Sequence, residues 1–143
     1  DLYCGTGTIG IYVANLVKTV YGIEIVEDAI EDAKFNAKEN NIDNIQFYCG
    51  DLKDILDSKD MQDIEQPTTI IVDPPRPGLH SNTIKNILAL SPNKIIYVSC
   101  NPATMARDIE LLVSEKYTIK DLQPIDMFPH TPHIECVTTL ILN

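Results

Sequence analysis

The sequence of 143 residues is 44% hydrophobic and 22% charged, a balance that suits one globular domain with a buried core. No apolar run approaches the roughly 20 residues that a membrane helix needs, and no signal peptide is visible, so we expect no association with a membrane. The formal net charge of −10 argues against a chain that binds nucleic acid by itself, because phosphate binding depends on Lys and Arg.

Strands and helices are predicted to alternate along the chain. Hydrophobic periodicity and breaker residues predict a first strand that ends near Tyr3, followed by strands over residues 19–25, 44–49, 69–73, 94–99, 120–126 and 135–142. Helices are predicted over residues 8–17, 27–40, 51–57, 81–90 and 102–114, and a polar loop over residues 58–67.

This alternation predicts an α/β fold of the Rossmann-like type, with a mostly parallel sheet and helices on both faces. The strands over residues 69–73 and 94–99 are rich in apolar residues, which is typical of strands buried on both faces of such a sheet. The last two strands are joined by a loop alone and should form an antiparallel hairpin. We expect residues 1–143 to form a single domain. Because the chain opens at Asp1 with what resembles the end of a strand, we interpret it as a fragment that lacks upstream residues.

The four cysteines are widely spaced and form no C-x-x-C pair, so we expect no zinc or iron–sulfur site in these residues. Nothing indicates secretion, and we expect reduced thiols in a cytoplasmic protein. Cys100 directly precedes a predicted helix, whereas Cys4, Cys49 and Cys136 lack that setting and are interpreted as structural.

A glycine-rich turn with the sequence GTGTIG, from Gly5 to Gly10, connects the first strand to the first helix. Glycines allow a tight turn and let a ligand approach the backbone closely. Glu24 ends the second strand, where a carboxylate can accept hydrogen bonds from ribose hydroxyls. Asp51 follows the third strand, where an adenine amine can donate to it. The pattern indicates a nucleotide site, and by itself it favours a nicotinamide dinucleotide and S-adenosylmethionine equally.

Two further motifs lie at the carboxyl ends of neighbouring strands. Asp73 opens the motif DPPR, whose prolines keep the strand end extended and direct Asp73 toward the edge where open α/β sheets bind ligands. Cys100 lies in the motif SCNP directly before a helix, whose positive end favours a reactive thiolate. A buried structural cysteine is the alternative interpretation, but the place of Cys100 beside Asp73 favours a nucleophile.

The loop before the last strand has the sequence FPHTPHIE, from Phe128 to Glu135. Its two His residues and Glu do not complete the ligand set of a metal site, so we expect no bound metal. One interpretation is a polar hairpin loop. The other is that the loop brings Glu135 over the ligand-binding edge as a base.

With these motifs, the chain resembles the RNA 5-methyluridine (uracil-5-) methyltransferase family, the bacterial tRNA and ribosomal RNA uracil methylases. The resemblance is carried by DLYCGTG from Asp1, DPPRPGL from Asp73, SCNPAT from Ser99 and DMFPHTPHIE from Asp126, in family order over nearly the whole chain. It implies the catalytic domain of an S-adenosylmethionine-dependent methyltransferase that modifies carbon 5 of a uridine in rRNA or tRNA.

The resemblance also implies residue roles. Cys100 would attack carbon 6 of the uracil, and Glu135 would remove the proton from carbon 5. Thiolate addition turns the ring into an enolate that can attack an activated methyl group, and the base must first be swung out of its stack. Asp73 would hold the uracil through its polar edge. The residues implied for the S-adenosylmethionine pocket and its rim are Tyr3, Gly5, Thr8, Glu24, Asp51 and Asp73.

The chain departs from the family by lacking an N-terminal RNA-binding domain, an upstream Phe and Gln motif, and the iron–sulfur region that many members carry. We therefore expect the RNA to be bound mainly through the missing upstream parts. We predict that residues 1–143 alone bind S-adenosylmethionine weakly or not at all and do not methylate RNA. Efficient methyl transfer by these residues alone would contradict that prediction.

Single residues in the motifs distinguish this chain from other classes of methyltransferase. N-methylating enzymes carry an aromatic residue where Arg76 stands, and RNA cytosine-5-methyltransferases use a second cysteine in the motif that here holds Asp73. From other classes, the alternatives are an NAD-binding Rossmann module and a non-catalytic interaction module. A comparison of S-adenosylhomocysteine binding with NAD binding tests the NAD-binding module. A Cys100→Ala change in the full-length enzyme tests the non-catalytic module.

Overall fold

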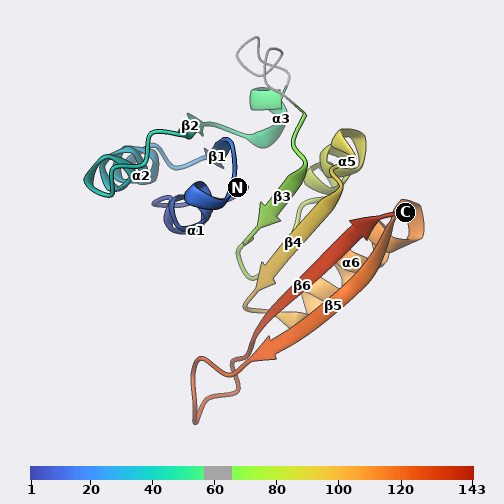
Figure 1. The fold of residues 1–143 in the computed structure, drawn as a ribbon. Coiled ribbons are helices and arrows are strands. Elements are labelled where there is room, and N and C mark those ends of the chain that lie inside the picture. The colour runs from blue at the N-terminus through green and yellow to red at the C-terminus, as the bar shows by residue number, and fades with distance from the viewer. Residues whose placement is uncertain (57–65) are drawn as a thin grey trace. The chain divides into compact units, whose positions relative to one another are not determined.

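The fold is taken from a computed structural model, which describes residues 1–56 and 66–143. The chain divides into two compact units, Asp1–Ile64 and Glu65–Asn143, and each is considered by itself. Figure 1 traces the elements of each unit in chain order. The polar loop predicted over residues 58–67 lies, apart from its last two residues, outside the described part. No helix in the described residues is long and apolar enough to cross a membrane.

The first unit is built on a pair of parallel strands. Its elements are α1 (Thr8–Val13), the 3-10 turn η1 (Ala14–Leu16), β1 (Val20–Glu24), α2 (Glu27–Glu39), β2 (Ile45–Cys49) and α3 (Leu52–Leu56). The parallel register places Val20 opposite Ile45 and Glu24 opposite Cys49. The strand predicted to end near Tyr3 is present as a single parallel bridge from Leu2 to Ile23.

The first predicted helix is shorter than its periodicity indicates. α1 ends at Val13 and continues as a 3-10 turn. The Asn44 side-chain amide donates to the carbonyl oxygens of Ala14 at 2.8 Å and Val17 at 3.1 Å, so the residue directly before β2 satisfies the helix end. This partner, about 30 positions away in sequence, supplies the stop that helix periodicity cannot contain.

Helix α2 confirms the prediction over residues 27–40. Its apolar positions Ile30, Ala33 and Ala37 are buried, as helical spacing requires. Acidic residues occupy its first turn and a lysine its last, which the helix dipole favours. The helix ends where Asn41 adopts a left-handed conformation with φ of 56°.

The second unit is a four-stranded mixed sheet with two helices. Its described elements are β3 (Thr69–Val72), α5 (Ser81–Leu90), β4 (Lys94–Ser99), α6 (Pro102–Glu115), β5 (Tyr117–Ile125) and β6 (Glu135–Leu142). The strand order is β3-β4-β6-β5. β3 and β4 are parallel, whereas β6 runs antiparallel to both of its neighbours, which confirms the predicted terminal hairpin.

Burial alternates along β3, β4 and β6, whereas β5 is exposed beyond Tyr117. In β4 every second residue is buried, including Ile95 and Tyr97, and β6 follows the same pattern. The expectation that β3 and β4 are buried on both faces is therefore wrong, because Ile71 and Ile96 on the other face are only half-buried. The packed face is the one on which α6 contacts β4 and β5.

Candidate functional site

The glycine-rich turn of the first unit combines one open glycine with one packed glycine. Gly5 has φ of 52°, and a Cβ added to it would meet nothing within 4 Å. Gly7 has φ of 82°, and a Cβ there would lie 3.0 Å from Phe47 and 3.1 Å from Ala33. Gly7 thus allows close packing of the turn against the strand and helix, while Gly5 leaves room for a ligand to reach the backbone.

Glu24 lies at the turn, as its place at the end of a strand predicts. One carboxylate oxygen accepts a hydrogen bond from the Gly5 amide at 3.1 Å, and the other accepts from Ile25 at 2.8 Å and Val26 at 3.1 Å. Each carboxylate oxygen has two lone pairs. Glu24 therefore fixes the shape of the turn and retains acceptor capacity on Oε2 for a hydroxyl donor.

The other predicted residues of this pocket surround the same turn. Tyr3 precedes it with φ of 62°, and Thr8, exposed, begins α1 just after it. Asp51 is exposed after Gly50, whose amide donates to the Glu24 carbonyl at 2.9 Å. The structure therefore brings the backbone next to Asp51 to the strand end that carries Glu24.

A ligand with hydroxyl and amine donors fits the hydrogen-bond acceptors around this turn. Gly5 provides the open approach, and Glu24 and Asp51 provide acceptors. Oδ1 of Asp1 is buried and has no hydrogen-bond partner among the described residues. Oδ2 of the same carboxylate accepts from the Gly10 amide at 2.9 Å. The acceptors of Glu24 and Asp51 match the ribose hydroxyls and the amine of a nucleoside.

In the second unit, Asp73, Cys100 and Glu135 lie at one edge of the sheet, and we name them the strand-end cluster. β4 and β6 pair Ser99 with Cys136, so Cys100 and Glu135 are the next residues across the antiparallel strands. Asp73 directly follows β3, which runs parallel to β4. The register therefore brings together three residues that are far apart in sequence.

Asp73 is an exposed acid whose carboxyl pKa is raised. Desolvation by neighbouring protein atoms is the main cause, and the negative charge of Glu135 adds to it.

Cys100 differs from the other cysteines in its setting. It is half-buried and stands directly before Asn101, the N-cap of α6, whose side chain accepts from the Ala103 amide at 3.2 Å. Cys4 and Cys136 are buried, and burial raises the pKa of both thiols, that of Cys4 to about 11. Cys49 is exposed, so the structural interpretation given to it is not supported by burial.

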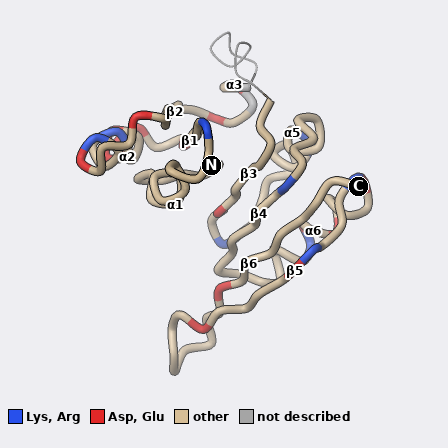
Figure 2. The backbone as a smooth tube through the Cα atoms, in the orientation of Figure 1, with Lys and Arg blue, Asp and Glu red and all other residues tan. Residues whose placement is uncertain are grey.

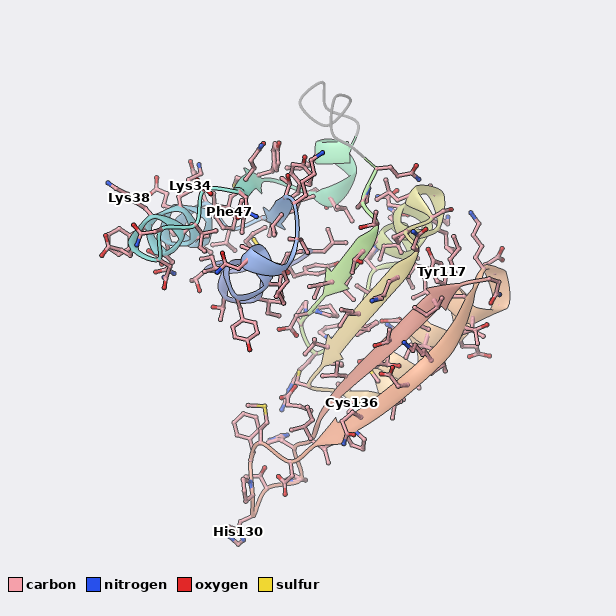
Figure 3. The ribbon with its side chains drawn as sticks, in the orientation of Figure 1. Lys34, Lys38, Phe47, Tyr117, His130 and Cys136 are labelled. Carbon is pink, nitrogen blue, oxygen red and sulfur yellow. The ribbon has the colours of Figure 1, made fainter. Side chains whose placement is uncertain are left out.

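The loop between β5 and β6 carries the two predicted histidines. His130 has φ of 70° and lies at the tip of the loop, far from the sheet (Figure 3). His133 is closer to the strand, and its Nδ1 lies 3.0 Å from a guanidinium nitrogen of Arg76. Among the described residues no three His, Cys, Asp or Glu side chains are grouped as metal ligands.

Sequence reasoning missed one polar residue of this region, Asp108. It lies on the buried face of α6 with Met105, Ile109 and Leu112, and it is completely buried. Its signal was present in the sequence, because helical spacing places an aspartate among those three apolar residues. Its contacts reach the loop that follows Asp73 and are described below.

The family model described as tRNA (Uracil-5-)-methyltransferase matches residues 1–142. An RNA methyltransferase of Bacteroides thetaiotaomicron is 52% identical over 143 residues, which are 100% of this chain and 31% of that protein. The chain therefore spans about a third of the length of the curated relatives that it matches.

Solved structures of methyltransferases match the fold of this chain. The crystal structure of Pyrococcus abyssi tRNA (uracil-54, C5)-methyltransferase in complex with S-adenosyl-L-homocysteine matches with a TM-score of 0.80 and 40% identity, over 99% of this chain and 33% of that one. A S-adenosylmethionine-dependent methyltransferase fold from Streptococcus mutans matches with a TM-score of 0.79 at 18% identity, over 99% of this chain and 43% of that one. The Rossmann-like α/β fold predicted from the sequence is thereby confirmed.

Proposed function

The chain belongs to the tRNA (uracil-5-)-methyltransferase family, and from this premise we propose that it is the catalytic part of an enzyme that methylates carbon 5 of a uridine in RNA. The observation that carries the proposal is the strand-end cluster. A thiol, Cys100, stands across the β4–β6 register from a carboxylate, Glu135, and a second acid, Asp73, follows β3 at the same edge of the sheet. Methylation of this carbon needs a nucleophile and a base of these kinds.

The cofactor is S-adenosylmethionine, in keeping with the S-adenosyl-L-homocysteine bound by the Pyrococcus abyssi relative. When bound, it supplies an electrophilic methyl group. In this chain the open backbone at Gly5 would receive the ligand, and the remaining acceptor capacity of Glu24 would bind its ribose hydroxyls. Tyr3, Thr8 and Asp51 surround the same turn, and Asp51 would accept from the adenine amine.

Cys100 opens the reaction. Its thiolate adds to carbon 6 of the uracil, which moves the ring electrons onto the carbonyl oxygen as an enolate and makes carbon 5 a nucleophile. Asp73 would hold the uracil by its polar edge. Carbon 5 would then take the methyl group from S-adenosylmethionine; the carbon–sulfur bond to that methyl group breaks, its electron pair stays on the sulfur, and S-adenosylhomocysteine is the leaving group.

Glu135 closes the reaction. After methyl transfer, carbon 5 still carries its proton, and the Glu135 carboxylate removes it. The electron pair left on carbon 5 forms the 5,6 double bond and expels the Cys100 sulfur, so the thiolate is regenerated. Because the two residues lie opposite each other in the register, one ring can contact both.

Binding of the RNA would rest mainly on parts of the enzyme outside these residues. The chain has 21 acidic and 11 basic residues, and Figure 2 shows few Lys or Arg positions along either unit. An RNA-binding surface needs clustered positive charge. A separate basic part, in an enzyme about three times as long, would attract a tRNA or rRNA in the cytoplasm and leave the uracil to be flipped into the site.

A Cys100→Ala change in the full-length enzyme tests the proposal. We expect methyl transfer to fall by roughly 10⁴-fold or more, because the covalent route is lost, whereas binding of S-adenosylhomocysteine stays unchanged. Cys49→Ala, which removes an exposed thiol, is the matched control and should keep full activity. Undiminished methyl transfer by the Cys100→Ala enzyme would remove the nucleophile from the proposal.

A further inference from the structure

Asp108 is a buried carboxylate that receives four hydrogen bonds. Its Oδ2 accepts from the Leu79 amide and from the Tyr97 hydroxyl, each at 2.7 Å. Its Oδ1 accepts from Nε and Nη2 of Arg107 at 2.9 and 2.7 Å. Burial and the bond to Asp108 raise the pKa of Tyr97, which keeps its hydroxyl a donor. We name these residues and the backbone of Pro77 and Leu79 the Asp108 network.

The network holds the loop that follows Asp73. Nη2 of Arg107 also donates to the Pro77 carbonyl at 2.9 Å. Gly78, with φ of 81°, passes so close that an added Cβ would lie 2.5 Å from Oδ2 of Asp108. The loop backbone therefore lies directly against the helix that bears the carboxylate, and only glycine fits there.

A second pair of contacts joins the same loop to the start of the helix. The Arg76 carbonyl accepts from the Asn101 side-chain amide at 3.2 Å and from the Thr104 hydroxyl at 3.1 Å. Asn101 directly follows Cys100 and caps α6. One helix thus binds the loop at Arg76, Pro77 and Leu79 while it fixes the residue next to the thiol.

We propose that Arg107 and Asp108 are positioning residues, which hold Asp73 in a fixed place relative to Cys100 through the loop from Pro75 to Leu79. The proposal rests on the function assigned to the strand-end cluster. Neither residue touches the uracil in this account, so neither is catalytic. They act through the backbone that leads from Asp73 and through the helix that begins after Cys100.

Two physical points favour positioning over simple folding stability. The contacts fall on the backbone that follows Asp73, at Arg76, Pro77 and Leu79, and on the helix that begins after Cys100. The Arg107–Asp108 ion pair joins a 54% exposed side chain to a completely buried one, and an ion pair with a desolvated charge is a poor source of net stability, because the cost of desolvation offsets the attraction. A network that fixes geometry explains why a charged residue is tolerated on the buried face of α6.

The test uses the full-length enzyme with Arg107→Ala, which removes a 54% exposed side chain together with both of its donors to Oδ1 of the buried Asp108, so the folding of the variant is checked alongside its rate. We expect kcat to fall roughly 10- to 100-fold, the cost of a displacement of about 1 Å at a reacting group, with KM for S-adenosylmethionine unchanged. The rate of covalent trapping on 5-fluorouridine RNA should fall in parallel. Arg107→Lys, which can still donate to Asp108 or Pro77, should restore most of kcat.

Two further measurements keep the outcome interpretable. Lys85→Ala, on the exposed side of α5, is the matched control for loss of a surface cation and should behave as the wild type. Rates are expressed per S-adenosylhomocysteine-binding site, so that unfolded enzyme is not counted. An Arg107→Ala rate equal to the wild type on that scale overturns the positioning role. Absence of trapping by the wild-type enzyme would instead contradict the proposed function.

Discussion

In the glycine-rich turn of the first unit, backbone conformation sets the geometry, whereas in the strand-end cluster of the second unit a side-chain network sets it. The turn depends on left-handed glycines and on Glu24, whose three hydrogen bonds all come from backbone amides within 19 positions in sequence. The cluster depends on strand register and on Asp108, whose Leu79 partner is 29 positions away.

This difference reflects two functional requirements, binding of a nucleoside and covalent chemistry. A pocket for a nucleoside needs an open backbone with acceptors nearby, and local sequence can encode it. A covalent reaction needs a nucleophile, a base and a substrate-holding group to be fixed to within a fraction of an ångström, which requires support from several elements. The following changes should affect one region and leave the other untouched.

Glu135→Gln should have the largest effect, and only on the chemistry assigned to the second unit. Loss of the base should slow methyl transfer by about 10²- to 10⁴-fold, and a covalent enzyme–RNA species should accumulate because elimination needs the carbon 5 proton to leave. Denaturing gels of enzyme mixed with RNA and S-adenosylmethionine measure this species. Normal turnover, or weaker binding of S-adenosylhomocysteine, would contradict the separation of roles.

Substitution of glycine by alanine should cost more in the second region than in the first. Gly78→Ala combines a left-handed φ of 81° with a contact of 2.5 Å to Oδ2 of Asp108, and should cost about 2–4 kcal/mol. Gly5→Ala has a left-handed φ but open space, and should cost only about 1 kcal/mol while weakening S-adenosylhomocysteine binding. Urea unfolding and calorimetry of the two variants make the comparison. Equal losses of stability would contradict it.

Asp73→Asn should give the smallest change, visible in the pH dependence of stability. The pKa of Asp73 is raised in the folded state, so the unfolded carboxyl ionises first as pH rises above about 4. The wild type therefore loses stability through this group between its unfolded and folded pKa values. Asparagine removes that loss, so the variant's melting temperature relative to the wild type should rise from pH 4 to pH 7. A constant or shrinking difference would show that Asp73 is not destabilised by ionisation.

Much of the fold could be predicted because its signals are local. The apolar spacing of Ile30, Ala33 and Ala37 placed α2, Pro102 placed the start of α6, and the missing crossover helix placed the antiparallel hairpin. The end of α1 could not be predicted, because Asn44 supplies it from another part of the chain. Burial of one sheet face rather than two was likewise outside the reach of strand composition.

Some features of the candidate site could likewise be predicted from the sequence, and others could not. Motif positions at strand ends placed Asp73, Cys100 and Glu135 at one edge, and the register agrees with that prediction. The use of Glu24 as an acceptor for three backbone amides was not foreseen, because it depends on how the turn folds over the strand end. Asp108 was missed because its partners lie in a loop that helix periodicity does not describe.

The most direct test of the account is to trap the full-length enzyme on RNA that contains 5-fluorouridine and to map the protein residue in the adduct. Fluorine at carbon 5 cannot leave as a proton does, so elimination stops and the carbon–sulfur bond persists. We expect a stable adduct in which the sulfur of Cys100 is joined to carbon 6 of the modified uridine. An adduct at another residue, or methyl transfer with no adduct, would contradict it.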